Sequence, residues 1–275
     1  MRACLVVVLA LLASTVVVVA PAAAVPGLVR RESLPEAANS TWYRQAWANC
    51  PSAGYRVVGA GAELIGAGNQ VRLTTVHPFT SDTGGSVFVR AEEFDTGFAG
   101  NWRLMAYAIC APVGSVPGYQ IVSGKTPDTS TVFQQATARC PGTKRVIGVG
   151  GGILHANGKV GLQLLRPANP LDISRATARE DADGYAANWS VTSYAICADR
   201  IESAAVYGQV ADGSGAQANC PPDKKLHSGG GGGGLTDSGP VWLDLLYPFD
   251  NMRTWWVAMT GTPTGGLSVG ALCAF

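Results

Sequence analysis

Two acidic clusters contain the side chains of this sequence that could do chemistry. The first includes Glu93 and Asp95, and the second includes Glu180 and Asp183. Carboxylates on a tight turn can bind calcium, and a facing pair can act as acid and base in glycoside hydrolysis. A solvated hairpin turn is the third interpretation, because Asp and Gly suit turns for backbone reasons alone. We favour the turn, keep a metal site at these four residues as an alternative, and predict no catalytic residue.

The histidines do not suggest a catalytic centre. A nucleophile–base pair needs a histidine held by a carboxylate close to Ser or Cys, but His77, His155 and His227 lie in unrelated local contexts and no Gly-x-Ser-x-Gly motif accompanies them. We interpret them as surface or strand-end residues. The chain is therefore predicted not to be an enzyme.

Aromatic residues in the last third of the chain form a candidate ligand site: Trp242, Tyr247, Trp255 and Trp256. Sugars stack on exposed aromatic faces while their hydroxyls bond to polar neighbours. We favour the alternative, that Trp255 and Trp256 fill the core there, and keep these four residues as the hypothesis for a site that binds a glycan or cell-envelope polymer.

The candidates are positioned by three copies of one unit. Each copy opens with Cys-Pro and closes with Cys-Ala, and each contains Val-x-Leu with a proline five residues after the leucine. The first two copies also share a closing strand with Trp102 and Tyr107, or Trp189 and Tyr194. Such fixed spacing indicates a repeated supersecondary unit that cannot bury its apolar face alone. We expect the two tryptophans in the core.

Each copy has the composition of β-strands, with short β-branched and aromatic segments separated by turns such as Asn157-Gly158 and Asp183-Gly184. Three copies of about four strands predict an all-β fold with three sheets around a pseudo-threefold axis, β-prism-like. A β-trefoil is the alternative. The glycine runs at 148–152 and 229–234 lack the Lys-Ser/Thr and helix of a phosphate loop, so they indicate close strand packing.

The N-terminus has the pattern of a secretory signal peptide at residues 1–24, with an apolar stretch and a small-residue cleavage site. An uncleaved membrane anchor is the alternative. Residues 25–40 are predicted to be a mobile lead-in, and residues 41–275 a single domain with repeats at about 41–112, 119–199 and 205–275. The protein is therefore predicted to be secreted, with no membrane association after cleavage.

Six cysteines lie beyond the leader, an even number that implies disulfides in a secreted chain. Sequence permits fifteen pairings. The repeat pattern selects Cys50–Cys110, Cys140–Cys197 and Cys220–Cys273. No Cys-x-x-Cys is present, so a metal site at these cysteines is not expected.

Charge excludes some partners. Removing Arg2 with the leader leaves 19 basic residues against 19 acidic ones, with no basic stripe in the sequence. Nucleic acid binding and charge-driven binding to acidic membranes are therefore not predicted. Nothing in the sequence calls for a cofactor.

The motif Cys-Pro followed by Arg-Val-x-Gly-x-Gly, Trp and Ala-Ile-Cys-Ala resembles repeats of uncharacterised secreted proteins of actinobacteria, across most of the mature chain. It has a looser similarity to vitelline membrane outer layer protein I, in the Cys-Pro, the Val-Gly strand and the closing cysteine strand. That similarity implies a disulfide-bonded threefold β-prism and carries no functional residues.

We predict a secreted, non-enzymatic binding module, lectin-like, that recognises a glycan or cell-envelope polymer. The alternative is a structural component of the extracellular layer that binds another extracellular protein. A glycoside hydrolase using Glu93 or Glu180 is the third hypothesis.

Overall fold

The computed structural model describes residues 25–94, 97–199, 203–210, 213–233, 241–261 and 263–274, with the backbone only for 203–210. The predicted signal peptide and Asp95 lie outside these ranges. The described chain confirms the all-β prediction, since it consists of strands apart from one turn of 3-10 helix, η1 (Val113–Ser115). Within these ranges no helix is long and apolar enough to span a membrane.

Each repeat contributes six strands rather than the four predicted. The first repeat contains β1 (Val29–Glu32), β2 (Tyr43–Asn49), β3 (Tyr55–Ile65), β4 (Val71–Ser81), β5 (Gly84–Glu93) and β6 (Arg103–Pro112). The second contains β7 (Gln120–Lys125), β8 (Phe133–Arg139), β9 (Arg145–Leu154), β10 (Val160–Ala168), β11 (Ile173–Glu180) and β12 (Ser190–Ala198). The third contains β13 (Ser203–Val210), β14 (Gly215–Asn219), β15 (Lys225–Gly233), β16 (Trp242–Pro248), β17 (Thr254–Thr260) and β18 (Leu267–Ala274).

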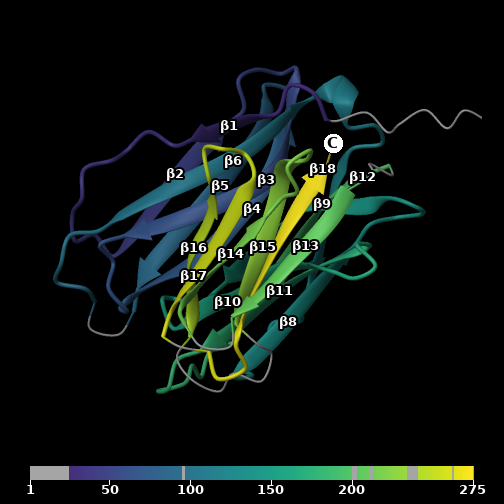
Figure 1. Ribbon diagram of the computed structural model, residues 1–275. Coiled ribbons are helices and arrows are strands. Elements are labelled where there is room, and N and C mark those ends of the chain that lie inside the picture. Colours follow the sequence, from purple (N-terminus) through teal and green to yellow (C-terminus); the bar gives the residue numbers. More distant parts are fainter. Residues whose placement is uncertain are drawn as a thin grey trace, which may run out of the picture.

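The eighteen strands form three antiparallel six-stranded sheets, and each sheet combines three strands from one repeat with three from another. Their orders are β1-β6-β3-β16-β17-β14, β13-β18-β15-β10-β11-β8 and β2-β5-β4-β9-β12-β7. Figure 1 shows the strands of the three sheets running in roughly the same direction, with the first repeat in purple to blue and the third in green to yellow. Every repeat is thus divided between two sheets, so no repeat forms a sheet alone.

The repeats meet at three seams: β3 beside β16, β4 beside β9, and β10 beside β15. Glycines line these seams because there is no room for a side chain. A Cβ on Gly61 would lie 2.2 Å from the Leu246 carbonyl oxygen, and one on Gly230 would lie 2.3 Å from that of Leu165. These contacts agree with the prediction that the glycine runs mark close strand packing.

One hydrophobic core lies between the sheets. It includes the equivalent tryptophans Trp102 and Trp189, which have no exposed surface and confirm the core prediction. The edge strands β2, β8 and β14 alternate exposed residues with buried alanines, the period-two pattern of a strand with one solvated face.

Three disulfides close the repeats: Cys50–Cys110, Cys140–Cys197 and Cys220–Cys273. They are the pairs that the repeat pattern selected. Loops of 53 to 60 residues imply about 4 kcal/mol of stabilisation from each bond on the chain-entropy estimate.

The prediction of a mobile lead-in at residues 25–40 needs correction. Strand β1 lies within it and pairs with β6 along Val29–Glu32. It occupies the place that β7 takes beside β12. The first repeat therefore begins at β1, because the outermost strand of that sheet comes from this segment.

Candidate functional site

The glutamates of the two acidic clusters form hydrogen bonds with tryptophans and loop backbone of their own repeats. Glu93 ends β5 and is buried. One carboxylate oxygen accepts a hydrogen bond from the indole N–H of Trp102 at 2.8 Å, and the other accepts one from the backbone N–H of Phe98 at 2.9 Å. Two N–H donors are charge-assisted partners for a buried carboxylate, so Glu93 joins the β5–β6 loop to the buried indole.

Glu180 repeats this arrangement in the second unit. It accepts hydrogen bonds from the indole of Trp189 at 2.7 Å and from the backbone N–H of Tyr185 at 3.0 Å. Its neighbour Asp183 is exposed. Among the described residues, no three His, Cys, Asp or Glu side chains are grouped so that they could hold a metal ion.

The third repeat lacks this glutamate. In the sequence, Gly265 stands where the first two repeats have Trp102 and Trp189, and counting back nine residues from it puts Trp256 at the place of the glutamate. The strand register puts Gly261 there instead, because Leu243 opposes Met259 as Leu73 opposes Ala91. The count fails because the loop between β17 and β18 is shorter than its counterparts.

The predicted aromatic ligand site is not one site. Trp255 has no exposed surface, and Trp242 is 2% exposed. Trp256 is 39% exposed and Tyr247 is partly exposed, on strands β17 and β16. Trp255 packs so closely on β15 that a Cβ on Gly229 would lie 2.2 Å from its ring. Stacking of a sugar on Trp255 is therefore ruled out in this structure.

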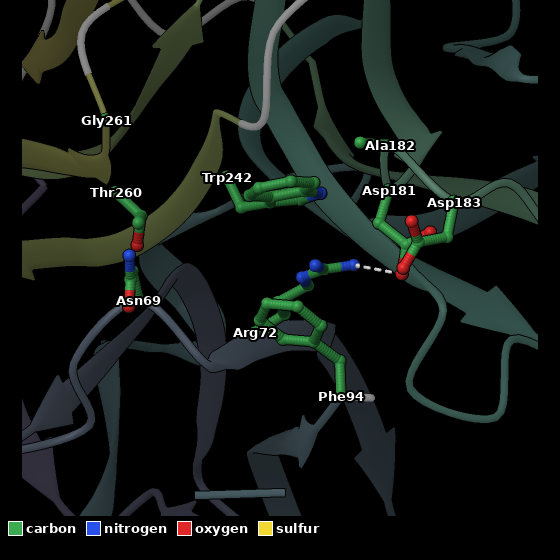
Figure 2. Close-up of a pocket in the computed structure, with 9 residues that line it drawn as sticks. All are labelled: Asn69, Arg72, Phe94, Asp181, Ala182, Asp183, Trp242, Thr260 and Gly261. Atoms are coloured by element: carbon green, nitrogen blue, oxygen red, sulfur yellow. Dashed lines mark hydrogen bonds and ion pairs between the residues drawn. The ribbon is translucent and has the colours of Figure 1, made fainter. Parts of the chain in front are cut away.

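Trp242 lines a pocket of about 380 Å³ at one end of the molecule, shown in Figure 2. The guanidinium of Arg72 lies between two rings, 3.4 Å from the centroid of Phe94 and 3.9 Å from that of Trp242. The Trp242 ring also lies against β10, where a Cβ on Gly161 would come within 1.9 Å of it. Contacts on both sides therefore leave this indole no face for a sugar, and the Arg72–Trp242 stack joins the repeats.

The pocket beside Trp242 also brings together residues that lie far apart in the sequence. Asp183, from the second acidic cluster, lines it with Asn69, Thr260 and Trp242. Behind it, the Thr260 hydroxyl donates to the Asp244 carboxylate, with oxygens at 2.7 and 2.6 Å. Burial raises the pKa of Asp244 to about 7. The pocket offers hydrogen-bonding groups, but its aromatic rings are engaged by Arg72.

The histidines take three environments. His155 is exposed in the turn after β9, and His77 is partly exposed on β4. His227 is 1% exposed, so its interpretation as a surface or strand-end residue is wrong. Its Nδ1 lies 2.9 Å from the Ile147 carbonyl oxygen, and burial lowers its pKa to about 4. It is a core residue that joins two repeats.

His77 belongs to an aromatic row that crosses one whole sheet. The outer surface of the sheet β2-β5-β4-β9-β12-β7 is called the His77 face. Its row comprises Trp47 opposite Phe88, Phe88 opposite His77 and, past Gly150 at the seam, Tyr194. His77 and Tyr194 stack in parallel, with ring centroids 4.0 Å apart and 15° between the planes.

The other end of the row is open to solvent. Trp47 is 48% exposed, and its ring contacts those of Phe88 at 4.6 Å and Phe79 at 5.3 Å. Five aromatic side chains thus share one sheet surface. Contiguous exposed aromatic patches on a folded domain mark binding surfaces.

Two hollows flank the His77–Tyr194 stack. The larger, about 400 Å³, lies over Gly152, and the smaller, about 310 Å³, lies towards Ile121 and Ser123 on β7. Burial lowers the pKa of His77, so the imidazole between the hollows is neutral at neutral pH.

Fixed polar groups surround the larger hollow. Arg90 forms an ion pair with Glu92 at 2.7 Å and lies over the ring of Tyr43. Glu92 also accepts the backbone N–H of Gly158 at 2.8 Å. Because these contacts hold Arg90 and Glu92 in place, the hollow has preorganised charged groups beside its rings.

The outer surface of the sheet β1-β6-β3-β16-β17-β14 has an equivalent row and is called the Tyr247 face. It carries Trp256 opposite Tyr247 and, past the seam, Tyr107. Glu63 stands where the His77 face has Gly152, since the two residues take equivalent positions at the β3–β16 and β4–β9 seams. The Tyr107 hydroxyl donates to Glu63, and burial together with this carboxylate raises the pKa of Tyr107. Glu63 thus fills the place that is hollow on the other face.

A sequence signal could have indicated these faces. The proline that follows each Val-x-Leu is flanked by aromatic rings in His77-Pro78-Phe79 and Tyr247-Pro248-Phe249. In the second repeat the same triplet is Arg166-Pro167-Ala168. Alternate residues of a strand share a face, so the two residues that flank each proline lie on the same surface. The triplets therefore predict an aromatic surface in the first and third repeats and a surface with an arginine in the second.

No protein-family model matches this sequence, and it has no match among curated proteins.

Proposed function

We propose that this protein is a secreted, non-enzymatic, lectin-like module that binds a glycan or cell-envelope polymer on the His77 face. The observation that carries the proposal is the open hollow over Gly152, bordered by the parallel His77–Tyr194 stack. Apolar C–H surfaces of a sugar pack on such rings while its hydroxyls bond to fixed polar groups. Arg90 and Glu92 supply those groups.

The shape of the surface favours a polymer as the ligand. The row extends from Trp47 on β2 to Tyr194 on β12, and hollows lie on both sides of the stack. A small molecule would occupy one hollow, whereas a chain of sugar units can lie along the row and use both. The polymer therefore makes several weak contacts whose effects combine.

The wider assignment belongs to the same proposal. Three repeats that share three sheets in a cyclic order support a β-prism-like arrangement around a pseudo-threefold axis. The three disulfides are compatible with a secreted chain whose leader is removed. The resemblance to secreted actinobacterial repeats and to vitelline membrane outer layer protein I agrees with this scheme. The hydrolase hypothesis has less support, because Glu93 and Glu180 are each bound to an indole.

The test is binding of the purified, oxidised mature protein to insoluble cell-wall polymers and to an array of soluble glycans. Trp47→Ala removes an exposed ring from the row and is expected to lower affinity about tenfold. Trp42→Ala is the matched control, because Trp42 is 46% exposed against 48% for Trp47 and is not part of the row.

Unchanged binding by Trp47→Ala, or equal loss in both variants, would exclude the His77 face. Trp256→Ala tests the aromatic ligand site predicted from the sequence in the third repeat, since Trp256 lies on the Tyr247 face. No binding to any polymer would favour the alternative of a structural or protein-interaction component.

A further inference from the structure

The third outer surface is chemically unlike the other two. It belongs to the sheet β13-β18-β15-β10-β11-β8 and is called the Arg175 face. Its row holds Thr137 opposite Arg175 and Arg175 opposite Arg166, where the His77 face has Trp47, Phe88 and His77. Beyond the seam, Gly230 opposes Gly270, so a glycine replaces the tyrosine of the other rows. Guanidinium groups thus take the positions of the aromatic rings.

Arg166 and Arg175 are direct cross-strand neighbours in the β10–β11 register. Like charges in this position destabilise a sheet, because their Cβ atoms are only about 5 Å apart. Arg179 lies four residues further along β11, beside Phe133. Arg139 lies at the other end of the face and pairs with Asp172. Four arginines therefore gather here in a chain whose formal net charge is only +1.

Two of these arginines have unused donors. The guanidinium groups of Arg175 and Arg179 donate no hydrogen bond within the described part of the chain. Neither residue forms an ion pair within the described part of the chain. Both side chains are partly exposed, so their N–H groups that reach the surface have no acceptor in the described chain, and an anion would supply one.

We propose that the Arg175 face binds the anionic groups of an extracellular polysaccharide. A guanidinium presents a planar pair of N–H donors that matches the oxygens of phosphate, sulfate or carboxylate. Two guanidinium groups on opposed strands can share one such anion, which offsets their mutual repulsion. A nucleic acid is a poorer fit, because its binding relies on neutralising many successive phosphates and this row is short.

The experiment measures affinity of the mature protein for four soluble polymers: dextran sulfate, polygalacturonate, dextran phosphate and neutral dextran, with duplex DNA as a fifth probe. Comparison of the first three identifies the preferred anion. Wild-type protein is expected to bind at least one anionic polysaccharide, not to bind neutral dextran, and to lose affinity as salt rises.

Arg175→Gln is expected to lower that affinity about tenfold, the effect of removing a charge-assisted contact. Arg31→Gln is the control, since it removes the same charge from exposed strand β1 in another sheet, and it should change affinity less than twofold. Because the substitution also relieves the repulsion with Arg166, Arg175→Gln should unfold at the same or higher urea concentration.

Equal losses in the two variants would reduce the effect to net charge and overturn the proposal. So would unaltered binding by Arg175→Gln, tighter binding to DNA than to any polysaccharide, or no binding to any anionic probe. Failure here is separable from failure of the glycan site. Trp47→Ala should leave anionic binding intact, and Arg175→Gln should leave neutral glycan binding intact.

Discussion

The His77 face and the Tyr247 face are made of equivalent strands with equivalent aromatic rows, but one is open and the other is filled. At the decisive position Gly152 leaves a hollow of about 400 Å³, whereas Glu63 accepts a hydrogen bond from Tyr107. Arg30 of β1 adds to the closure, since its guanidinium lies 4.7 Å from the Tyr107 centroid and 5.2 Å from that of Tyr247. The same repeat unit thus leaves a hollow in one place and fills the equivalent place with a side chain in another.

The ring geometry follows this difference. On the open face His77 and Tyr194 stack in parallel at 4.0 Å, while on the filled face Tyr107 and Tyr247 meet edge to face at 5.0 Å. Tyr107 is 3% exposed, and Tyr194 is only partly buried. The two equivalent rows thus differ at one seam residue, Gly152 or Glu63, and in the Arg30 contact, and one row is open where the other is packed.

Truncation of the two seam tyrosines should separate stability from binding most strongly. Tyr107→Ala is expected to lower the free energy of unfolding by about 3 kcal/mol, because a buried ring and its contacts are lost. Tyr194→Ala should cost less than half of that and should reduce glycan binding. Urea unfolding and polymer binding measure both. Equal stability losses would mean that the two faces are equally packed.

Opening the filled face is the second test. Glu63→Gly removes the acceptor of the Tyr107 hydroxyl and places another glycine in β3. It should lower stability by about 2 kcal/mol, from the unpaired hydroxyl and the flexible backbone. In a Trp47→Ala background, the same change should create weak glycan binding on the Tyr247 face. A variant that loses stability without gaining any binding would show that Glu63 is not what closes this face.

Filling the open face is the reciprocal test. Gly152→Glu should lower glycan affinity about tenfold, or about 1.4 kcal/mol. The fold should tolerate it, because a Cβ there would be in ordinary contact, 3.5 Å from the Thr75 methyl and 3.9 Å from Tyr194. Gly152→Ala is the control, since a methyl group fills little of the hollow. Retained affinity in Gly152→Glu would place the glycan elsewhere.

The smallest expected effect concerns pH. Burial lowers the pKa of His77 in the folded protein below its ordinary value of 6.5, so the folded state binds fewer protons than the unfolded chain. The stabilisation is present above pH 6.5 and declines as the pH falls towards the folded pKa. His77→Tyr, which copies Tyr247, should weaken the fall in unfolding free energy between pH 8 and pH 5. Since His227 titrates in both proteins, identical profiles would contradict a contribution from His77.

Local pattern was sufficient for several features of the fold. Alternation and turn residues identified strands, and equal spacing identified three repeats and therefore the three disulfide pairs. The burial of Trp102 and Trp189 followed from their recurrence. These features depend on residues within one repeat, where sequence distance and spatial distance agree. Strand β1 was missed because its short segment looks like a linker until β6 pairs with it.

The candidate sites were beyond local pattern. Glu93 and Glu180 were noticed as chemical groups, but only the folded loop shows that each carboxylate is bound to the tryptophan nine residues later. Trp255 and Trp256 are adjacent in sequence and point to opposite sides of β17, so one is buried and the other is exposed. The sequence indicates that neighbouring residues of this strand alternate between two sides, but it does not indicate which side faces the core.

The sequence by itself determined the all-β class, the repeats and the cysteine pairing, because these depend on period and spacing. Tertiary structure alone decided that each sheet combines two repeats, and therefore that His77 meets Tyr194 and that Arg72 meets Trp242. It also gathered Arg166 and Arg175 on one face of a chain whose formal net charge is only +1. The physical reason is that contacts across a seam join residues far apart in the chain, and net charge is a sum that carries no information about position.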